Sequence, residues 1–262
     1  IVVAASAPNL AYYCSVHSGM GGSVNTNSTL GSSNFDGSIQ TTVKVNATAG
    51  FSIVSYAGNQ SSAYTIGHGL GVAPKIIFTK SRSDTANWGV YYNILGVNTN
   101  YLTLNTSDAQ GANNNSEMSG YYAILNSSTV QMSSNAFGDV GSSLIMYAFS
   151  EVAGYSKFGS YTGNGNANGT FVYTGFRPAF LIVKATGLTE SWYLYDNKRN
   201  TFNAVDKYLR ADNSLAEGTF IIGDLLSNGF KIRQTDSALN TNGQTYIYLS
   251  FAEFPFKNAR AR

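Results

Sequence analysis

The segment Phe180-Leu181-Ile182-Val183-Lys184 predicts the fold of this 262-residue chain more directly than any other. It is short, rich in branched and aromatic side chains, and it follows Pro178, a pattern typical of a buried β-strand. Lys75-Ile76-Ile77-Phe78-Thr79-Lys80 has the same character and follows Pro74. Asparagine and glycine turn signals separate such segments, and helix signals are confined to a short turn around 224–226. The sequence therefore predicts an all-β chain.

The two segments belong to an internal duplication, which decides the organisation of the chain. The anchors of the first copy recur 104 residues later (178 − 74): Pro74, Lys80, Trp88 and Tyr91 return as Pro178, Lys184, Trp192 and Tyr195. Glu151 returns as Glu253 at an offset of 102 residues (253 − 151), and Asp108 corresponds approximately to Asp212. Each copy holds about six or seven strand candidates in about 100 residues, enough for one antiparallel sandwich.

We therefore expect two tandem, repeat-related antiparallel β-sandwiches of jelly-roll or lectin-like type. The first copy is assigned to residues 50–153 and the second, with a basic tail, to residues 154–262. Residues 23–49 are interpreted as a linker with a lead-in strand, and residues 1–22 as the end of a preceding β-domain. The copies are joined almost without a linker, which favours rigid packing between them and leaves a single fused sandwich as the alternative.

Charge is scarce in this chain. Charged residues make up 11% of it, against about 25% in an average soluble domain, and the net charge is +2. A groove that binds phosphates needs clustered Lys and Arg, so no nucleic-acid partner is expected. No run approaches the roughly 18 apolar residues of a membrane span, so no membrane insertion is expected. A single cysteine excludes an internal disulfide framework.

No catalytic constellation is recognisable, so the chain is predicted not to be an enzyme. His17 and His68 are the only histidines, and His68, within a glycine-rich turn, is interpreted as an exposed turn residue. A catalytic pair requires two carboxylates that face one bond. Glu151 and Glu253 occupy equivalent positions in two copies instead, which predicts strand-end carboxylates bonded to backbone amides or to the repeated lysines.

The one cluster of metal-type side chains is Cys14, His17 and Met20. The stretch from Tyr12 to Gly22 resembles the C-terminal ligand loop of cupredoxins. In that family the Cys, His and Met of the loop bind copper together with a second His from an earlier strand, which this sequence lacks. The resemblance implies either a copper site or the end of a cupredoxin-like domain that serves as scaffold without metal. We expect the scaffold, and no cofactor.

Aromatic residues are the candidates for binding. Trp88 and Trp192 could stack on sugar rings, but their repetition favours core packing. Four unrepeated aromatics lie among Asn, Ser and Gly, a composition found in adaptable recognition loops. These predicted ligand-binding residues are Tyr121, Tyr122, Phe137 and Phe202.

Several motifs carry a family resemblance over about residues 38–262. Gly154-Tyr155-Ser156-Lys157-Phe158-Gly159-Ser160-Tyr161, Leu226-Ser227-Asn228-Gly229-Phe230-Lys231 and Phe251-Ala252-Glu253-Phe254-Pro255-Phe256-Lys257 are similar to motifs in tail-fibre and other virion structural proteins of tailed bacteriophages, especially marine ones. The resemblance implies a component of the phage particle that forms homo-oligomers, for example trimers, and contacts other virion proteins.

Two functions are compatible with that resemblance. The first is a tail fibre or similar appendage that binds a glycan or other receptor on the host surface non-covalently, for which a surface of neutral polar and aromatic groups is suited. The alternative is a decoration protein of the capsid or tail that has a packing role and no receptor.

Overall fold

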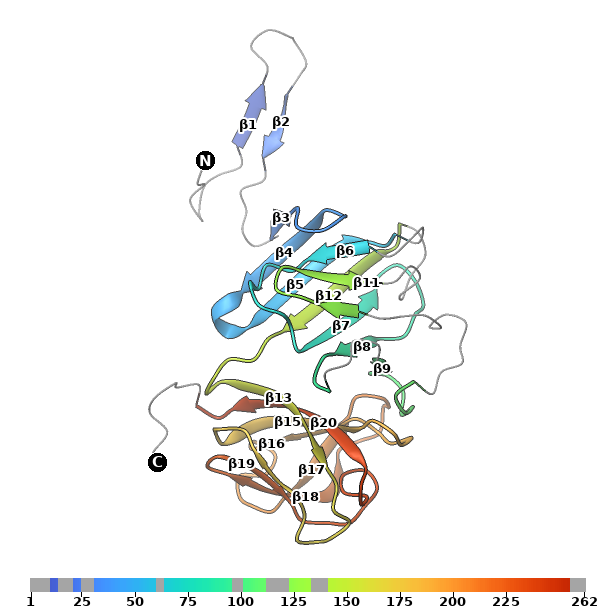
Figure 1. Ribbon diagram of the computed structural model, residues 1–262, viewed down its shortest axis with the longest axis vertical. Helices are drawn as coiled ribbons and strands as arrows, with labels where there is room; N and C mark the ends of the chain where they lie inside the picture. The colour runs from blue at the N-terminus through green and yellow to red at the C-terminus, as the bar shows by residue number, and fades with distance from the viewer. Residues whose placement is uncertain are drawn as a thin grey trace.

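The computed structural model describes residues 10–13, 21–24, 31–59, 64–95, 101–111, 123–132 and 141–254. All pairs of neighbouring strands in these ranges are antiparallel, and their one helical element is a 3-10 turn, η2 (Ala47–Ala49). The predicted all-β antiparallel fold class is confirmed. The segment around 224–226, for which we expected a helical turn, is part of a strand instead. Figure 1 shows two β units, one above the other.

The upper unit, called the first unit below, contains a large and a small sheet. Its strands are β3 (Ser32–Asn34), β4 (Thr41–Asn46), β5 (Phe51–Ala57), β6 (Tyr64–Gly67), β7 (Ile76–Ser81), β8 (Gly89–Tyr92), β9 (Tyr101–Thr103), β10 (Ala123–Leu125), β11 (Thr129–Met132) and β12 (Ser143–Phe149). Seven strands form one sheet in the order β3-β4-β5-β12-β7-β8-β9, and three form the other in the order β10-β11-β6. Ahead of them, β1 (Leu10–Tyr13) and β2 (Gly21–Val24) pair with each other.

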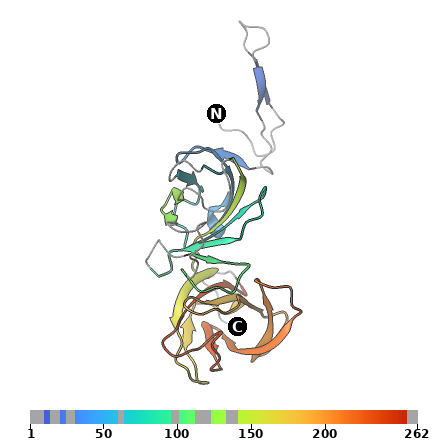
Figure 2. The ribbon, with the colours of Figure 1, turned by 90° about the vertical axis from the view of Figure 1, so that its right-hand side faces the viewer.

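The lower unit, called the second unit below, is built from one eight-stranded sheet. Its strands are β13 (Ser156–Thr162), β14 (Phe171–Tyr173), β15 (Pro178–Ala185), β16 (Tyr193–Asp196), β17 (Val205–Arg210), β18 (Gly218–Leu226), β19 (Gly229–Ile232) and β20 (Thr245–Ala252). They follow the order β13-β20-β15-β16-β17-β18-β19-β14, and the sheet curls into a nearly closed barrel (Figure 2).

The two units have the same strand order once they are aligned on the duplication. The series β5-β12-β7-β8-β9 and β10-β11-β6 corresponds to β13-β20-β15-β16-β17 and β18-β19-β14. Among the described residues, β9 and β10 do not pair in the first unit, whereas β17 pairs with β18 in the second. β3 and β4 have no counterpart, and β3 lies within a region that we had interpreted as linker. β4 pairs with β5 and so covers an edge that β13 leaves open.

Alternate side chains of the central strands enter two different cores. In β7, Ile77 enters the core of the first unit, while Ile76 and Phe78 point to the opposite face of the sheet. In β15, Leu181 and Val183 enter the core of the second unit, and Ile182 points to the opposite face. Sheets covered on both faces have nearly continuous apolar strands, which explains the uninterrupted hydrophobic runs in the sequence.

A third core joins the two units, and it is made from equivalent sheet faces of both. Its buried members are Ile76, Phe78, Val90, Tyr92 and Leu102 from the first unit, and Phe158, Trp192, Ile247 and Leu249 from the second. Phe78 and Ile182 are separated by the repeat offset of 104 residues, and both pack in this core. Each unit therefore has its own core, and the outer faces of their corresponding sheets are packed against each other.

Lys184 connects the units at the margin of the shared core. Its ammonium nitrogen, on a fully buried residue, donates to the carbonyls of Leu188 (3.4 Å) and Glu190 (2.6 Å) and to Ser107 O of the first unit (3.1 Å). Lys80 binds the carbonyls of Asp84 and Ala86 at the same spacings of four and six residues. Both lysines therefore hold the loop that follows their strand, and Lys184 also holds the neighbouring unit.

Candidate ligand-binding face

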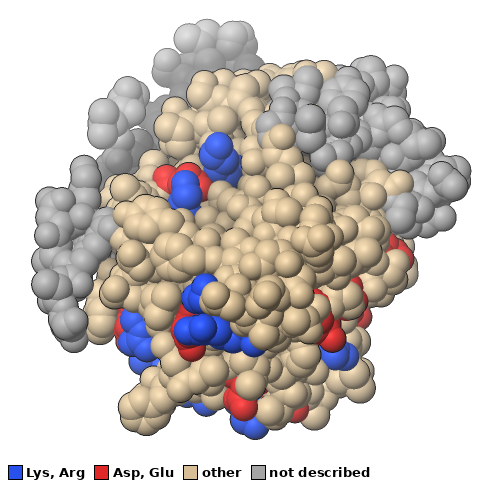
Figure 3. Space-filling model, turned by 60° about the horizontal axis from the view of Figure 1, so that its bottom comes forward, with Lys and Arg blue, Asp and Glu red and all other residues tan. Residues whose placement is uncertain are grey.

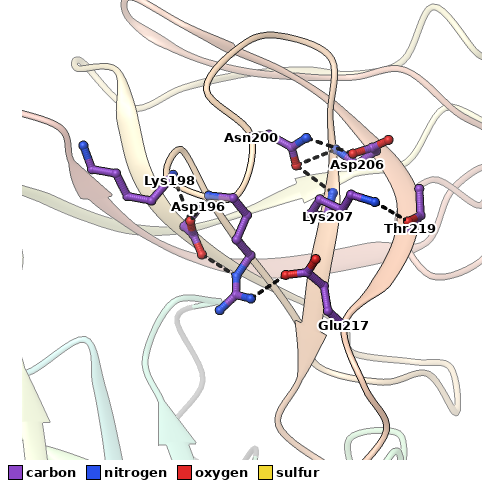
Figure 4. Close-up of polar contacts among 8 residues, drawn as sticks. Asp196, Lys198, Asn200, Asp206, Lys207, Glu217 and Thr219 are labelled. Carbon is purple, nitrogen blue, oxygen red and sulfur yellow. Dashed lines mark hydrogen bonds and ion pairs between the residues drawn. The ribbon is translucent and has the colours of Figure 1, made fainter.

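One predicted binding residue, Phe202, lies on a loop that the protein holds in place from both ends. The Phe202 loop (residues 197–204) joins β16 to β17, and the Phe202 side chain is 82% exposed. A single exposed apolar side chain is ordinary on a protein surface, so the case for binding depends on how firmly the loop backbone is held, because a fixed backbone lowers the ordering cost of binding. The hydrogen bonds around the loop show how it is fixed (Figure 4).

Asp196 and Asn200 organise the start of the loop. Asp196 Oδ1 accepts from the backbone N–H of Lys198 at 2.9 Å and of Arg199 at 2.8 Å. Asn200 Oδ1 accepts from the backbone of Asp206 at 3.1 Å and of Lys207 at 2.7 Å, which ties the loop to the first residues of β17. Burial by itself would raise the pKa of Asp196, but the two backbone amides and the Arg199 guanidinium outweigh it and lower that pKa.

Asn203 attaches the end of the loop to β18. Its Nδ2 donates to Leu225 O at 3.1 Å, and its Oδ1 accepts from Leu225 N at 2.9 Å, so one side chain pairs with both backbone groups of one residue. Phe202 immediately precedes this anchor. The loop therefore presents its aromatic ring from a backbone that has few alternative positions.

Arg199 links the Phe202 loop to the segment before β18. Its Nε donates to Asp196 Oδ2 and its Nη1 to Glu217 Oε2, both at 2.7 Å. Hydrogen bonds to Glu217 and Asp196 raise the pKa of Arg199. Ion pairs this exposed contribute little stability, so their effect here is positional. Leu215, two residues before Glu217, is 66% exposed, which places a second apolar side chain beside the bridged loops.

Most of the other predicted site residues lie outside the described part of the chain. These are Tyr121, Tyr122 and Phe137 among the binding candidates, and Cys14, His17 and Met20 among the metal candidates. Within the described ranges, no three His, Cys, Asp or Glu side chains are grouped so that they could hold a metal ion. In the same ranges, no helix has the length and apolarity needed to cross a bilayer.

The repeated tryptophans have different environments. Trp192 is fully buried in the shared core, and its indole Nε1 donates to Thr103 O of the first unit at 2.8 Å. Trp88 is partly exposed and stacks on Tyr147, with 6.3 Å between ring centroids and 20° between planes. Pro74, two residues ahead of β7, and Pro178, the first residue of β15, are both buried.

Of the two expected kinds of partner for the equivalent glutamates, the backbone amide is found for Glu151, and neither glutamate pairs with a repeated lysine. Glu151 accepts from the backbone N–H of Phe158 at 2.9 Å and pairs with Lys157 at 3.1 Å. Glu253 pairs with Arg177 at 2.9 Å. Lys80 and Lys184 bind loop carbonyls because the ends of their side chains lie within the turns that follow β7 and β15.

Asp212 corresponds to Asn105, so the approximate match with Asp108 was wrong. Asp212 Oδ1 accepts from Trp192 N at 2.9 Å, and Asn105 Oδ1 accepts from Trp88 N at 2.8 Å. The offset here is 107 residues (212 − 105). The segment from Trp192 to Asp212 is therefore three residues longer than the segment from Trp88 to Asn105.

His68 is not an exposed turn residue but is fully buried. Its Nδ1 accepts from Leu70 N at 3.2 Å, and its Nε2 faces Asn126 O at 3.1 Å, an arrangement that fits the neutral ring with the proton on Nε2. Burial lowers the pKa of His68. In the second copy Thr174 takes its place, because Thr174 Oγ1 accepts from Phe176 N, also two residues on. The residue therefore has a structural role in a turn.

Sequence reasoning missed four exposed aromatic residues, one of which, Phe254, is 40% exposed. Phe35, Phe171 and Tyr173 are 74%, 43% and 65% exposed, respectively. The alternation in Phe171-Val172-Tyr173 was the signal for the last two, since a strand with one buried face directs its first and third side chains to the other face. No such pattern marks Phe35.

The chain belongs to a protein family, described as a domain of unknown function (DUF7483), whose match covers residues 25–255. The match extends over both units and over β3 and β4, so the family domain comprises the whole two-unit body. No curated protein and no solved structure matched the chain significantly.

Proposed function

We propose that this protein is a structural component of a tailed-bacteriophage virion, in a tail fibre or similar appendage, and that it binds a glycan on the host surface non-covalently. The observation that carries the binding proposal is the exposed Phe202 ring on a loop held by Asn200, Asn203 and Asp196. A fixed backbone reduces the ordering cost of binding, and an aromatic face suits the C–H surface of a sugar. The sequence resemblance to virion proteins supports the location on the phage particle.

The surface of the second unit supports a neutral or mixed type of contact. Figure 3 views the molecule from the end at which that unit lies, and most of the visible surface there is uncharged. The Lys, Arg, Asp and Glu side chains on it lie singly or in small groups of both signs. Contacts of this kind depend weakly on salt, which suits an extracellular surface exposed to variable ionic strength.

Binding of the 262-residue chain to host cells and to a glycan array tests the proposal. We expect binding that falls at least tenfold when Phe202 is replaced by alanine, whereas the matched variant Phe35→Ala, on the first unit, binds as the original protein does. Failure of the unmodified chain to bind susceptible cells or any glycan would refute the receptor role.

A second candidate function is a decoration protein of the capsid or tail with a packing role only. The pairing of β1 with β2, and with no other described strand, favours it, because an isolated two-stranded hairpin is marginally stable and gains from a neighbouring surface. Locating the chain in intact virions distinguishes the two functions. A position on the capsid lattice supports decoration, and a position at a fibre tip supports host attachment.

A further inference from the structure

Two exposed aromatic side chains, Phe171 and Tyr173, lie on the outer face of β14, the last strand of the eight-stranded sheet. Between them, Val172 enters the core of the second unit. Residues two apart on a strand share a face and lie about 6.6 Å apart. The two rings therefore form a pair aligned along the strand, with no described element covering them.

Gly229 has no side chain that would stand between the Phe171 ring and the sheet. It is the cross-strand partner of Tyr173 on β19, and a Cβ built on it would lie 2.0 Å from Val172 O and 3.2 Å from a ring carbon of Phe171. Gly229 lies in a strand, and the turn that precedes it is formed by Ser227 and Asn228. The glycine is therefore required for clearance, and it lets the Phe171 ring lie close to the sheet.

Positive charge in excess of negative charge borders the aromatic pair. Lys231 lies opposite Phe171 on one side and Asp224 on the other. Arg233 is the residue directly after β19, and its backbone N–H donates to Ile222 O of β18 at 3.0 Å. Arg233 Nε donates to Asp224 Oδ2 at 2.7 Å, and Lys231 Nζ donates to Gly169 O at 3.0 Å. Two cations and one anion leave a net charge of +1.

The geometry leaves donors available for a ligand. The ion pair with Asp224 uses Nε of Arg233, and no described residue accepts from its two Nη groups, on a side chain that is 46% exposed. Two guanidinium N–H groups of this kind bind a carboxylate in a bidentate manner. The surface thus combines a stacking face for a ring with a fork for an anion.

We propose that Phe171, Tyr173 and Arg233 form a second carbohydrate subsite, which takes an acidic sugar. The sugar ring lies on the two aromatic side chains, its carboxylate is bound by Arg233, and Lys231 adds positive charge. A neutral sugar would leave the surplus charge unmatched, so the charge selects the acidic class. The inference rests on the proposed glycan-binding function but uses none of the residues that support it.

The subsite lies on the same group of strands as the Phe202 loop. Asn203 holds that loop to Leu225 on β18, and β18 is separated from β14 only by β19. Adjacent strands are 4.7–4.9 Å apart, so about 10 Å separates β18 from β14. One extended polysaccharide can therefore contact the loop and the subsite together, and two weak contacts on one ligand reinforce each other.

The test measures binding of the full chain to oligosaccharides that carry uronic or sialic acid and to the same oligosaccharides after carboxyl reduction. We expect the acidic forms to bind at least tenfold more tightly. Arg233→Gln should remove this preference, and Phe171→Ala with Tyr173→Ala should weaken binding of both forms about tenfold. Circular dichroism and thermal unfolding confirm that each variant is folded, and Phe35→Ala is the matched control.

The outcomes separate this inference from the proposed function. Equal affinity for acidic and reduced forms, or tighter binding of sulfated or phosphorylated probes, overturns the assignment to carboxylated sugars. If Phe202→Ala abolishes glycan binding while the β14 variants bind normally, the subsite is refuted and the proposed function stands. If the β14 variants lose binding and Phe202→Ala does not, the subsite stands and the role of the Phe202 loop is refuted.

Discussion

Trp192 in the second copy donates its indole N–H to the carbonyl oxygen of Thr103 in the first copy, 89 residues away, at 2.8 Å. The ring is fully buried in the core that the two copies share. A buried carbonyl without a hydrogen-bond donor is destabilising, because its lost hydration is not replaced by another hydrogen bond. This one bond therefore couples the stability of each copy to its contact with the other.

Replacing Trp192 with phenylalanine should lower the free energy of unfolding by about 2–4 kcal/mol. The substitution removes a donor from a buried carbonyl and leaves space in a close-packed core. Urea denaturation measures the change. Trp88→Phe is the matched control, since Trp88 is partly exposed and stacks on Tyr147, and it should cost less than half as much. Equal losses in the two variants would contradict the asymmetry of the shared core.

Lys184 should make stability rise with pH above 8. Burial lowers its pKa from the ordinary 10.5 to about 8 in the folded protein. Between these values the unfolded chain binds more protons than the folded one, so stability increases with pH in this window. The unfolding free energy of the original protein minus that of Lys184→Met should therefore rise between pH 8 and 10, by on the order of 2 kcal/mol.

Taking this difference cancels the titration of the tyrosines, which both proteins share. Chemical denaturation at several pH values provides the measurement. A difference that stays constant or falls across the window would show that Lys184 is not held in a desolvated site.

His68 should destabilise the fold as the pH drops below 6.5. Burial lowers its pKa from the ordinary 6.5, so below that value the unfolded chain takes up a proton that the folded protein resists. The stability present above pH 6.5 is lost as the pH falls toward the folded pKa. Histidine NMR resonances in the original protein and in His68→Asn identify the ring and follow its titration. A midpoint at or above 6.5 would contradict the buried, neutral histidine.

Glu151 should protect an open sheet edge from self-association. β13 pairs with β20 on one side only, and Glu151 accepts from Phe158 N, which faces the unpaired side. Charged groups on edge strands suppress pairing between molecules. Glu151→Ala should therefore increase the fraction of larger species in analytical ultracentrifugation at equal concentration. Lys157→Ala removes the same ion pair but leaves the carboxylate on Phe158 N, and it should sediment like the original protein.

Asn203 should control the order of the Phe202 loop without controlling the fold. Asn203→Ala removes both hydrogen bonds to the Leu225 backbone, each worth about 1 kcal/mol. We expect faster hydrogen exchange in residues 197–204 and weaker glycan binding, with unchanged exchange in β15 and β20. Thr201→Ala, in the same loop, is the comparison variant. Unchanged exchange in the loop of Asn203→Ala would show that its backbone is not held by this side chain.

Much of the architecture could be predicted because local signals repeat. The spacing from Pro178 through Lys184 to Trp192 matches that from Pro74 through Lys80 to Trp88, and the equivalent strands follow it. Strand propensity and apolar runs located the central strands, since these properties depend on neighbouring residues. Pairing of β4 with β5 was beyond such reasoning, because the relevant contacts form only when the sheet assembles.

The candidate site was less predictable, for physical reasons that individual residues illustrate. Trp88 and Trp192 occupy the same place in their copies, but only Trp192 has a carbonyl of the other copy within reach of its indole. His68 stands among glycines, yet surrounding strands bury it. Exposure depends on distant elements in each case. The exposure of Phe202 could be predicted, because its polar and small neighbours are themselves typical of a surface loop.

Because the equivalent outer sheet faces pack against each other, recombination can transfer this domain between proteins intact only when both copies move together. A single copy, cut out alone, would turn Phe78 and Val90, or Trp192 and Leu249, from a buried core toward water. Recombination that transfers only one copy therefore yields a fragment with an exposed apolar face, whereas transfer of both copies keeps these residues buried. The smallest segment that keeps this core buried therefore contains both copies, and the family match also spans both copies.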